Sequence, residues 1–279
     1  MAGVPTGPTE TTSPSVETEE ERAVRHRKRL TFDAVADLYE ATRRGYPDEA
    51  VALLVETAGV GPGGAVLEVG CGTGQLTRQL VPYGFDLTAI DISPAMIELA
   101  TRVVPAPNVS FLATSFEDFD GGDTVFDLVV SATAWHWLDP EIAYVKAARF
   151  LRPGGWLALL ATGETYDEPL GSKLRNLWTA LSRSAAARGG RAATGRAHDP
   201  AGRDLFGPEV SHRYEERLTA SAERIDGLER TRATSLDYDP DRAARYDAGL
   251  RRLLNDITEI ELTQHTSLTL MQLGGGGRL

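Results

Sequence analysis

The chain has 279 residues, of which 42% are hydrophobic and 25% charged, the ordinary composition of a globular protein. Its formal net charge of −11 argues against a nucleic-acid partner, because phosphate binding favours a basic face. No apolar run approaches the ~20 residues that span a bilayer, and the N-terminus lacks the apolar core of a signal peptide. The single cysteine, Cys71, permits no internal disulfide. We therefore expect a cytoplasmic protein with no membrane partner. The length allows one main hydrophobic core, alone or together with a lid.

The N-terminal part divides into a polar tail and two helices. Residues 1–16 are rich in Pro, Thr, Gly and Ser, and we expect them to be disordered. Residues 17–29 carry mixed charges and are expected to begin a helix. Apolar residues then recur at helical spacing and predict one buried stripe: Phe32, Val35, Ala36 and Tyr39. A second helix is expected from about Asp48 until Gly59 ends it.

From residue 65 onward, short apolar runs alternate with helical patterns. The runs predict strands at 65–69, 86–91, 109–112, 125–131 and 156–161. Ser93-Pro94 and Asp139-Pro140 each combine a capping residue with a proline suited to the first helical turn. Strands separated by single helices pair in parallel through right-handed crossovers, so we expect an α/β fold with a doubly wound, mostly parallel sheet.

This alternation ends near Thr162. Residues 163–206 are expected to be helical, with a flexible piece around Gly189, Gly190 and Gly195. Polar and apolar residues alternate at 210–218 and 259–273, which predicts two half-buried strands. Charged helical stretches at 220–233 and 239–255 lie between these strands, and 274–279 form a flexible tail.

A glycine-rich turn links the first two strands of the alternating region. Gly70, Gly72 and Gly74 follow the strand that carries Glu68, and Asp91 ends the next strand. Glycine permits positive φ and close approach of a ligand, and the free N–H groups of the following helix point at the turn. A dinucleotide fingerprint would place its third glycine where this chain has Gln75, so the spacing argues against that class.

The segments VLEVGCGTGQL and AIDIS together resemble the cofactor site of class I S-adenosylmethionine-dependent methyltransferases. FDAVADLYEATRRGYP, TSFEDF, FDLVVSATAWHWLDP and FLRPGGWLAL resemble further blocks of one group in that family, mostly small-molecule enzymes. The resemblance extends from about Phe32 to Thr162. It implies a seven-stranded sheet ending in an antiparallel hairpin, which the two late strands would supply. We therefore expect a single domain at 17–273, with its cofactor-binding core at 60–162 and helical lid segments at 163–206 and 220–255.

The resemblance also implies roles for individual residues. Backbone of the glycine turn would contact the amino-acid end of the cofactor, Asp91 the ribose, and neighbouring side chains the adenine. The implied cofactor-binding set is Tyr39, Arg43, Glu68, Gly70, Cys71, Gly72, Gly74, Asp91, Ile92, Met96, Ser115, Phe116, Glu117, Ser131, Ala132 and Thr133. Arg43 would pair with the cofactor carboxylate. Thr114 stands where many relatives carry an Asp that receives the adenine amino group, and Arg44 where the group favours Pro.

Several of these residues have a structural alternative. Glu68 could be a surface charge, although Glu inside an apolar strand is uncommon. Asp91 could cap a helix, but Ser93 already fills that position. Tyr39 continues an apolar stripe, and Trp135 and Trp137 could be core aromatics. Cys71 is interpreted as a small residue that fills space in the turn.

His136 is the candidate catalytic residue. It follows the fourth strand at the carboxyl edge, where open α/β sheets hold ligands. An imidazole with an ordinary pKa near ~6.5 can remove a proton from an acceptor, although a hydrogen bond to backbone would explain the residue equally well. The other histidines, His26, His198, His212 and His265, show no metal-ligand spacing, so we expect no metal.

The expected reaction is direct methyl transfer from S-adenosylmethionine to an apolar or aromatic small molecule, with S-adenosylhomocysteine as product. Tyr166, Trp178 and Phe206 could supply the acceptor walls. Two alternatives stay open at this point: a dinucleotide-dependent oxidoreductase, and a protein that binds S-adenosylmethionine without transferring its methyl group, such as a cyclase-type enzyme. A homodimer is compatible with the family likeness.

Overall fold

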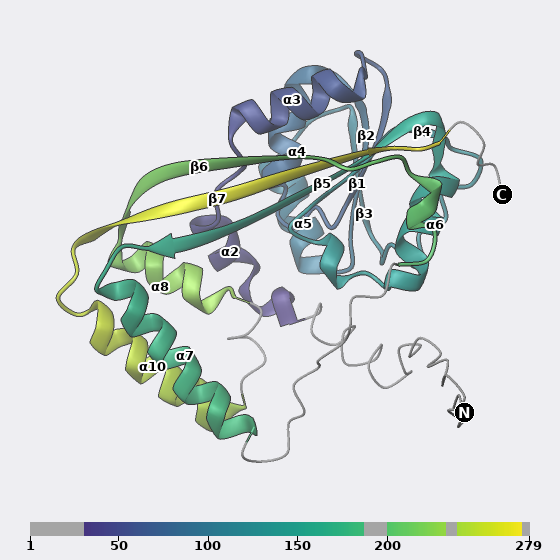
Figure 1. Ribbon diagram of the computed structural model, residues 1–279. Coiled ribbons are helices and arrows are strands. Elements are labelled where there is room, and N and C mark those ends of the chain that lie inside the picture. The colour runs from purple at the N-terminus through teal and green to yellow at the C-terminus, as the bar shows by residue number, and fades with distance from the viewer. Residues whose placement is uncertain (1–30, 187–199, 233–238, 275–279) are drawn as a thin grey trace, which may run out of the picture.

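A computed structural model describes residues 31–186, 200–232 and 239–274, and its centre is one seven-stranded sheet (Figure 1). The strands lie in the order β3-β2-β1-β4-β5-β7-β6. Their bounds are β1 Ala65–Val69, β2 Asp86–Asp91, β3 Val109–Ala113, β4 Phe126–Ala132, β5 Leu151–Tyr166, β6 Val210–Ser221 and β7 Glu259–Gln272. The first five strands pair in parallel, whereas β7 lies antiparallel between β5 and β6. The α/β class, the mostly parallel sheet and its antiparallel end are therefore confirmed.

Helices and short 3₁₀ turns connect these strands. They are η1 Thr31–Val35, α2 Ala36–Thr42, α3 Asp48–Ala58, α4 Gln75–Leu80, η2 Val81–Tyr83, α5 Pro94–Val103, η3 Trp135–Trp137, α6 Pro140–Phe150, α7 Leu170–Ala186, η4 Arg203–Leu205, α8 Ala222–Arg230 and α10 Pro240–Leu254. Ser93 and Asp139 cap α5 and α6 by accepting hydrogen bonds from backbone N–H groups, as their sequence positions predict. Gly59 ends α3 with a left-handed φ of 61°.

Two predicted boundaries are wrong. Residues 163–166 are not helical, because β5 continues through them and pairs with β7 as far as Tyr166 and Leu262. The regular alternation along β7 supplies a partner for each of these residues, so the strand ends only at Tyr166, and the helix α7 begins at Leu170. At the N-terminus, the expected helical stripe is divided into η1 and α2. The expectations for 1–16, 17–29, 275–279, Gly189, Gly190, Gly195, His26 and His198 lie outside the described residues.

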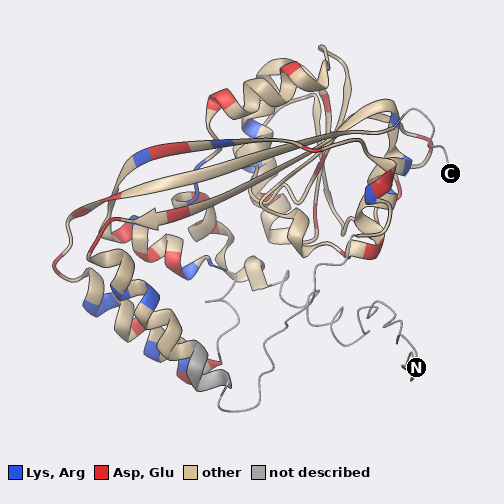
Figure 2. Cartoon of the chain, viewed as in Figure 1, with Lys and Arg blue, Asp and Glu red and all other residues tan. Residues whose placement is uncertain are grey.

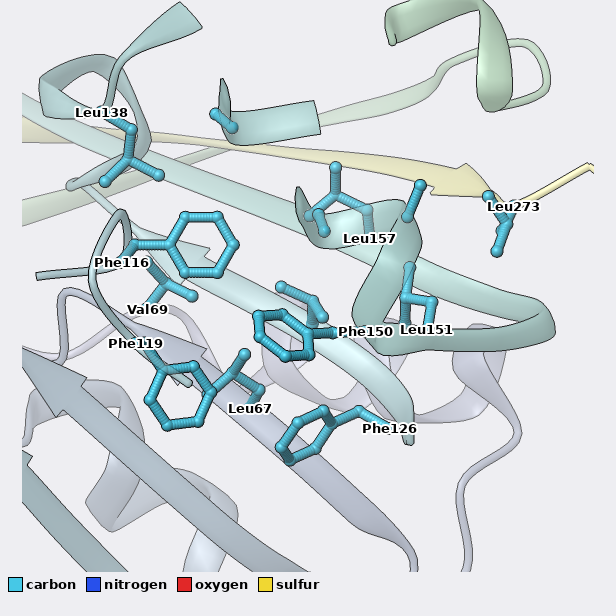
Figure 3. Packing of buried hydrophobic residues seen from close by; sticks show 14 of the residues in the cluster. Leu67, Val69, Phe116, Phe119, Phe126, Leu138, Phe150, Leu151, Leu157 and Leu273 are labelled. Carbon is cyan, nitrogen blue, oxygen red and sulfur yellow. The ribbon is translucent and has the colours of Figure 1, made fainter. Parts of the chain in front are cut away.

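Alternate residues of the central strands enter two different hydrophobic cores. Leu67, Val129 and Leu157 pack with α6 in one cluster, which Figure 3 shows with its phenylalanines. Val66, Leu128 and Ala158 pack with α3 and α4 in the other. Side chains of a strand point alternately to opposite faces, so helices cover both faces of the parallel sheet.

A third core lies beneath the long arm formed by β5, β7 and β6 (Figure 1). It buries residues of α7, α8 and α10 against the outer ends of these strands, among them Leu174, Ile225, Leu250 and Leu262. Each of the three helices is amphipathic and therefore needs such a partner surface. Among the described residues, no helix combines the length and the apolar character needed to cross a membrane.

Candidate functional site

The carboxyl ends of β1, β2 and β4 surround a pocket whose empty space, including its open mouth, is about 690 Å³. Ten of the sixteen residues expected at the cofactor line it: Tyr39, Gly70, Gly72, Asp91, Ile92, Met96, Ser115, Phe116, Ala132 and Thr133. Open parallel sheets hold ligands at this edge, because the following turns and helix N-termini gather there. The pocket thus brings together residues from five separate segments of the sequence.

The turn after β1 is built around left-handed glycines. Gly70, Gly72 and Gly74 have φ values of 72°, 56° and 91°. A Cβ on Gly70 would lie 2.3 Å from the Cβ of Ala134, whereas at Gly72 the nearest atom would be 3.8 Å away. Gly70 therefore allows the turn to pack against the segment after β4, and Gly72 leaves open space on the pocket side. These different needs explain why glycine stands at both positions.

Asp91 connects the turn to the next helix. Its carboxylate accepts hydrogen bonds from the backbone N–H of Gly72 and of Ser93, each at 2.9 Å. These two bonds fix the carboxylate at the tip of β2, where it lines the pocket. A carboxylate oxygen can accept more than one hydrogen bond. The Asp91 side chain therefore both stabilises the glycine turn and presents acceptor capacity to the pocket.

Glu68 does not line the pocket. Its carboxylate is buried and accepts a 2.7 Å hydrogen bond from Thr77 Oγ1, which ties β1 to α4. Burial raises the pKa of Glu68 to about 8, because the charged form loses its hydration. The surface-charge alternative is therefore wrong, and the contact shown for Glu68 is a link between two elements.

Arg43, the residue expected to hold the cofactor carboxylate, has its partners on β5 and just after α8. Its guanidinium lies 3.4 Å from Glu164 and donates to the Thr231 hydroxyl at 3.2 Å. The same group stacks over the ring of Tyr39, 5.4 Å from its centroid. Arg43 thus lies behind a lining residue, between the pocket and α8.

The four remaining members of the expected set also lie beside the pocket lining. Gly74 caps α4, and Ser131 donates to the carbonyl of Val69 at 2.8 Å. Glu117 accepts from the backbone N–H of Asp139 at 3.0 Å. Cys71 is buried, and burial raises the pKa of its thiol, which agrees with a space-filling residue.

Seven lining residues were not in the predicted set: Phe32, Val69, Ile90, Thr114, Ala134, Trp137 and Leu138. Val69 is the last residue of β1 and Ile90 the next-to-last residue of β2. Their positions at the carboxyl ends of parallel strands could have identified them as lining residues. Phe32 and Trp137 contact each other edge to face, with ring centroids 6.2 Å apart, across more than a hundred residues of sequence. No local pattern predicts such a contact.

His136 lies on η3, next to the lining residue Trp137, but does not itself line the pocket. Its ring is exposed and packs against that of Trp137, with centroids 5.1 Å apart. Partial burial lowers the pKa of His136 below its ordinary value. In the described part of the chain, no group of three or more His, Cys, Asp or Glu residues could hold a metal ion.

The fold and the pocket define a class of protein: an α/β chain with a pocket beside a glycine turn at the carboxyl edge of its sheet. A solved structure from Anaeromyxobacter dehalogenans, provisionally named as a type II methyltransferase, has the same fold, with a TM-score of 0.57 and 22% identity over 83% of this chain and 98% of that one. Residues 67–159 match a family model described as a methyltransferase domain. Over these residues the chain is therefore similar to methyltransferases.

Curated relatives resemble the chain over part of its length. An uncharacterized methyltransferase of Mycobacterium tuberculosis is 40% identical over 142 residues, which are 51% of this chain and 55% of the relative. A malonyl-[acyl-carrier protein] O-methyltransferase of Herminiimonas arsenicoxydans is 29% identical over 147 residues, with the same shares of both chains. The chain thus spans about half the length of the curated relatives it matches.

Proposed function

We propose that this protein transfers a methyl group from S-adenosylmethionine to a small-molecule acceptor. The observation that carries the proposal is the pocket itself, where the glycine turn and Asp91 meet at the carboxyl edge of the sheet. The match of residues 67–159 to a methyltransferase domain supports the reaction class. The acceptor expected from the sequence is apolar or aromatic, and the rings of Phe32, Tyr39 and Trp137 at the pocket support that part of the proposal.

The residues present fit this cofactor. The missing Cβ of Gly72 leaves space where the backbone meets the pocket, which suits close approach of an amino-acid group. Asp91 offers acceptor oxygens to ribose hydroxyls, and Ile92, Met96 and Phe116 offer apolar surface to a flat base. Ser115 adds a hydroxyl beside that surface. Thr114, Ala132 and Thr133 complete the adenine and sulfonium sides of the same wall.

When bound, the cofactor would supply a methyl group that its positively charged sulfur already activates. The protein's contribution is then to align the acceptor at ~3–3.5 Å and to keep water out. Tyr39 and Trp137 cover the pocket, and the Tyr46 hydroxyl lies 3.1 Å from that of Thr133 at the tip of β4. These groups would orient an acceptor beside the reacting atom. His136 remains the proposed general base for an acceptor that must lose a proton.

The six expected residues outside the lining take supporting roles in this proposal. Gly74, Cys71 and Ser131 shape the turn and the tip of β4, and Glu117 fixes the start of α6. Glu68 joins β1 to α4, and the guanidinium of Arg43 stacks on the ring of Tyr39.

We further propose that the sheet is doubly wound, which the two hydrophobic cores on its two faces support. Residues 17–273 would form one domain, in which 163–206 and 220–255 are the lid that binds the acceptor. A cytoplasmic location and a homodimer remain proposals.

Thermal unfolding with candidate ligands tests the function against its rivals. S-adenosylmethionine at about 100 times its Kd is expected to add about 2.7 kcal/mol to the stability of the native state. Protection by NAD but not by S-adenosylmethionine would revive the oxidoreductase. Protection by S-adenosylmethionine without turnover to S-adenosylhomocysteine, in the presence of a panel of acceptors, would favour a binding protein or a cyclase-type enzyme.

A further inference from the structure

Beyond the cofactor pocket, the extended part of the sheet carries a polar layer between two apolar cores. Thr162 and Glu164 of β5 pair with Thr266 and Gln264 of β7, and all four side chains fall on one face by strand alternation. Leu160 and Leu268 precede them in one core, and Tyr166 and Leu262 follow in another. We define the polar layer as these four residues together with Arg43 and Arg232, whose guanidinium groups both form ion pairs with Glu164.

Four buried atoms of this layer have no hydrogen-bond partner among the described residues: Thr162 Oγ1, Thr266 Oγ1, Glu164 Oε2 and Arg232 Nη2. Arg232 Nη2 and Glu164 Oε2 face each other at 3.6 Å, beyond hydrogen-bond length. The Glu164 side chain is only 5% exposed. Unpaired polar atoms in such a place are costly, and native proteins seldom leave several together. A ligand group that pairs with them would explain their presence.

The polar layer adjoins the cofactor pocket. Thr133, which lines the pocket, donates its backbone N–H to the carbonyl of Leu160, two residues before Thr162 on β5. Residues two apart on a strand are separated by about 7 Å. Arg43 stacks on Tyr39, which also lines the pocket. A molecule held by the layer would therefore reach the tip of β4, where the methyl group is expected.

Charge and hydrogen-bonding capacity indicate the kind of molecule. The Glu229 carboxylate is already satisfied by the hydroxyls of Tyr166 and Tyr246 and by Arg232 Nε. Three of the four groups without a hydrogen-bond partner can donate a hydrogen bond: the two hydroxyls and the Arg232 guanidinium. Within the described part of this layer and its rim, three arginines (Arg43, Arg224 and Arg232) outnumber two glutamates (Glu164 and Glu229). Figure 2 shows further basic positions on the adjoining helices α7 and α10, in a chain of net charge −11.

We propose that the polar layer is the acceptor subsite and that it binds a carboxylate group on the apolar or aromatic acceptor. A carboxylate brings two acceptor oxygens, which match the Thr162 and Thr266 hydroxyls and Arg232 Nη2. This inference rests on the proposed methyl transfer, because the layer gains a function only if the cofactor occupies the adjoining pocket.

The test uses the full chain saturated with S-adenosylhomocysteine and titrated calorimetrically with phenylacetate, benzoate, their neutral amides and benzylamine. The acids are expected to bind about ten-fold more tightly than the amides, the effect of a charge-assisted hydrogen bond. Thr266→Val keeps the side-chain shape and removes one hydroxyl, so it should weaken acid binding about ten-fold. Thr263→Val, on the opposite face of β7, is the matched control and should change nothing.

Thr266→Val gives a second readout without any ligand. Because the hydroxyl is unpaired, its replacement by a methyl group should raise Tm by about 2 °C. Equal binding of acids and amides, tighter binding of benzylamine, no binding of the acids, or an unchanged affinity in Thr266→Val would overturn the subsite. If S-adenosylhomocysteine itself fails to bind wild-type protein, the proposed function fails instead.

Discussion

At the scale of the residue, the buried Glu68 makes stability depend on pH. Its pKa is about 8 in the folded protein, against an ordinary value of 4.5. The native state therefore keeps a proton that the unfolded chain loses, and stability falls as pH rises from about 4.5 to 8. Glu68→Gln keeps an oxygen for the Thr77 hydroxyl and removes the titration. We expect the variant to match wild type near pH 5 and to exceed it at pH 8 by roughly 3–5 kcal/mol. Tm measured from pH 5 to 9 checks this, and an equal loss at every pH would contradict it.

His136 gives the second prediction at this scale. Because burial lowers its pKa, the imidazole is neutral and able to accept a proton at pH 7. If it acts as general base, the rate rises with pH through a pKa below 6.5, and His136→Ala lowers the rate about 100-fold and removes that limb. His212→Ala, on β6, is the control. A rate and pH profile that survive the loss of His136 would show that its ring only packs on Trp137.

At the scale of the element, the turn between β1 and α4 requires glycine for two different reasons. Gly70→Ala adds left-handed strain and a contact with Ala134 that is too short, and should cost about 2–4 kcal/mol. Gly122→Ala is the matched control, since its φ is 58° but nothing lies within 4 Å of the new Cβ. It should cost about 1 kcal/mol. Equal losses of unfolding free energy in urea would mean that the turn does not pack against the segment after β4.

The same elements show what the sequence can predict. The parallel strands, the caps at Ser93 and Asp139, and the late strands were predictable because each depends on nearby residues. The resemblance of several sequence blocks to a methyltransferase cofactor site implied ten residues that line the pocket. The extension of β5 was not predictable, because it needs the pairing with β7. Arg43 meets Glu164 and Thr231, more than a hundred residues away, so its partners could not be read from its own segment.

At the scale of the whole molecule, Arg43 connects the pocket lining to the segment just after α8. It stacks on Tyr39 and bonds to Thr231, just after α8. Cofactor binding should therefore slow amide hydrogen exchange in α2 and at the end of α8, and have a smaller effect on α10, which contacts α8 through Tyr246 and Asp247. Exchange measured with and without S-adenosylhomocysteine checks this. If slower exchange is confined to the glycine turn, cofactor binding at the pocket does not stabilise α8, and the expected connection through Arg43 is wrong.

We propose that the glycine turn and Asp91 bind S-adenosylmethionine, and calorimetry with that cofactor measures this binding. Wild-type protein should bind, and Asp91→Ala should weaken binding about ten-fold or more, because the ribose loses its acceptor and the Gly72 amide its partner. Asp86→Ala, an exposed acid at the other end of β2, should bind like wild type. No binding by wild type, or equal binding by Asp91→Ala, would contradict the claim.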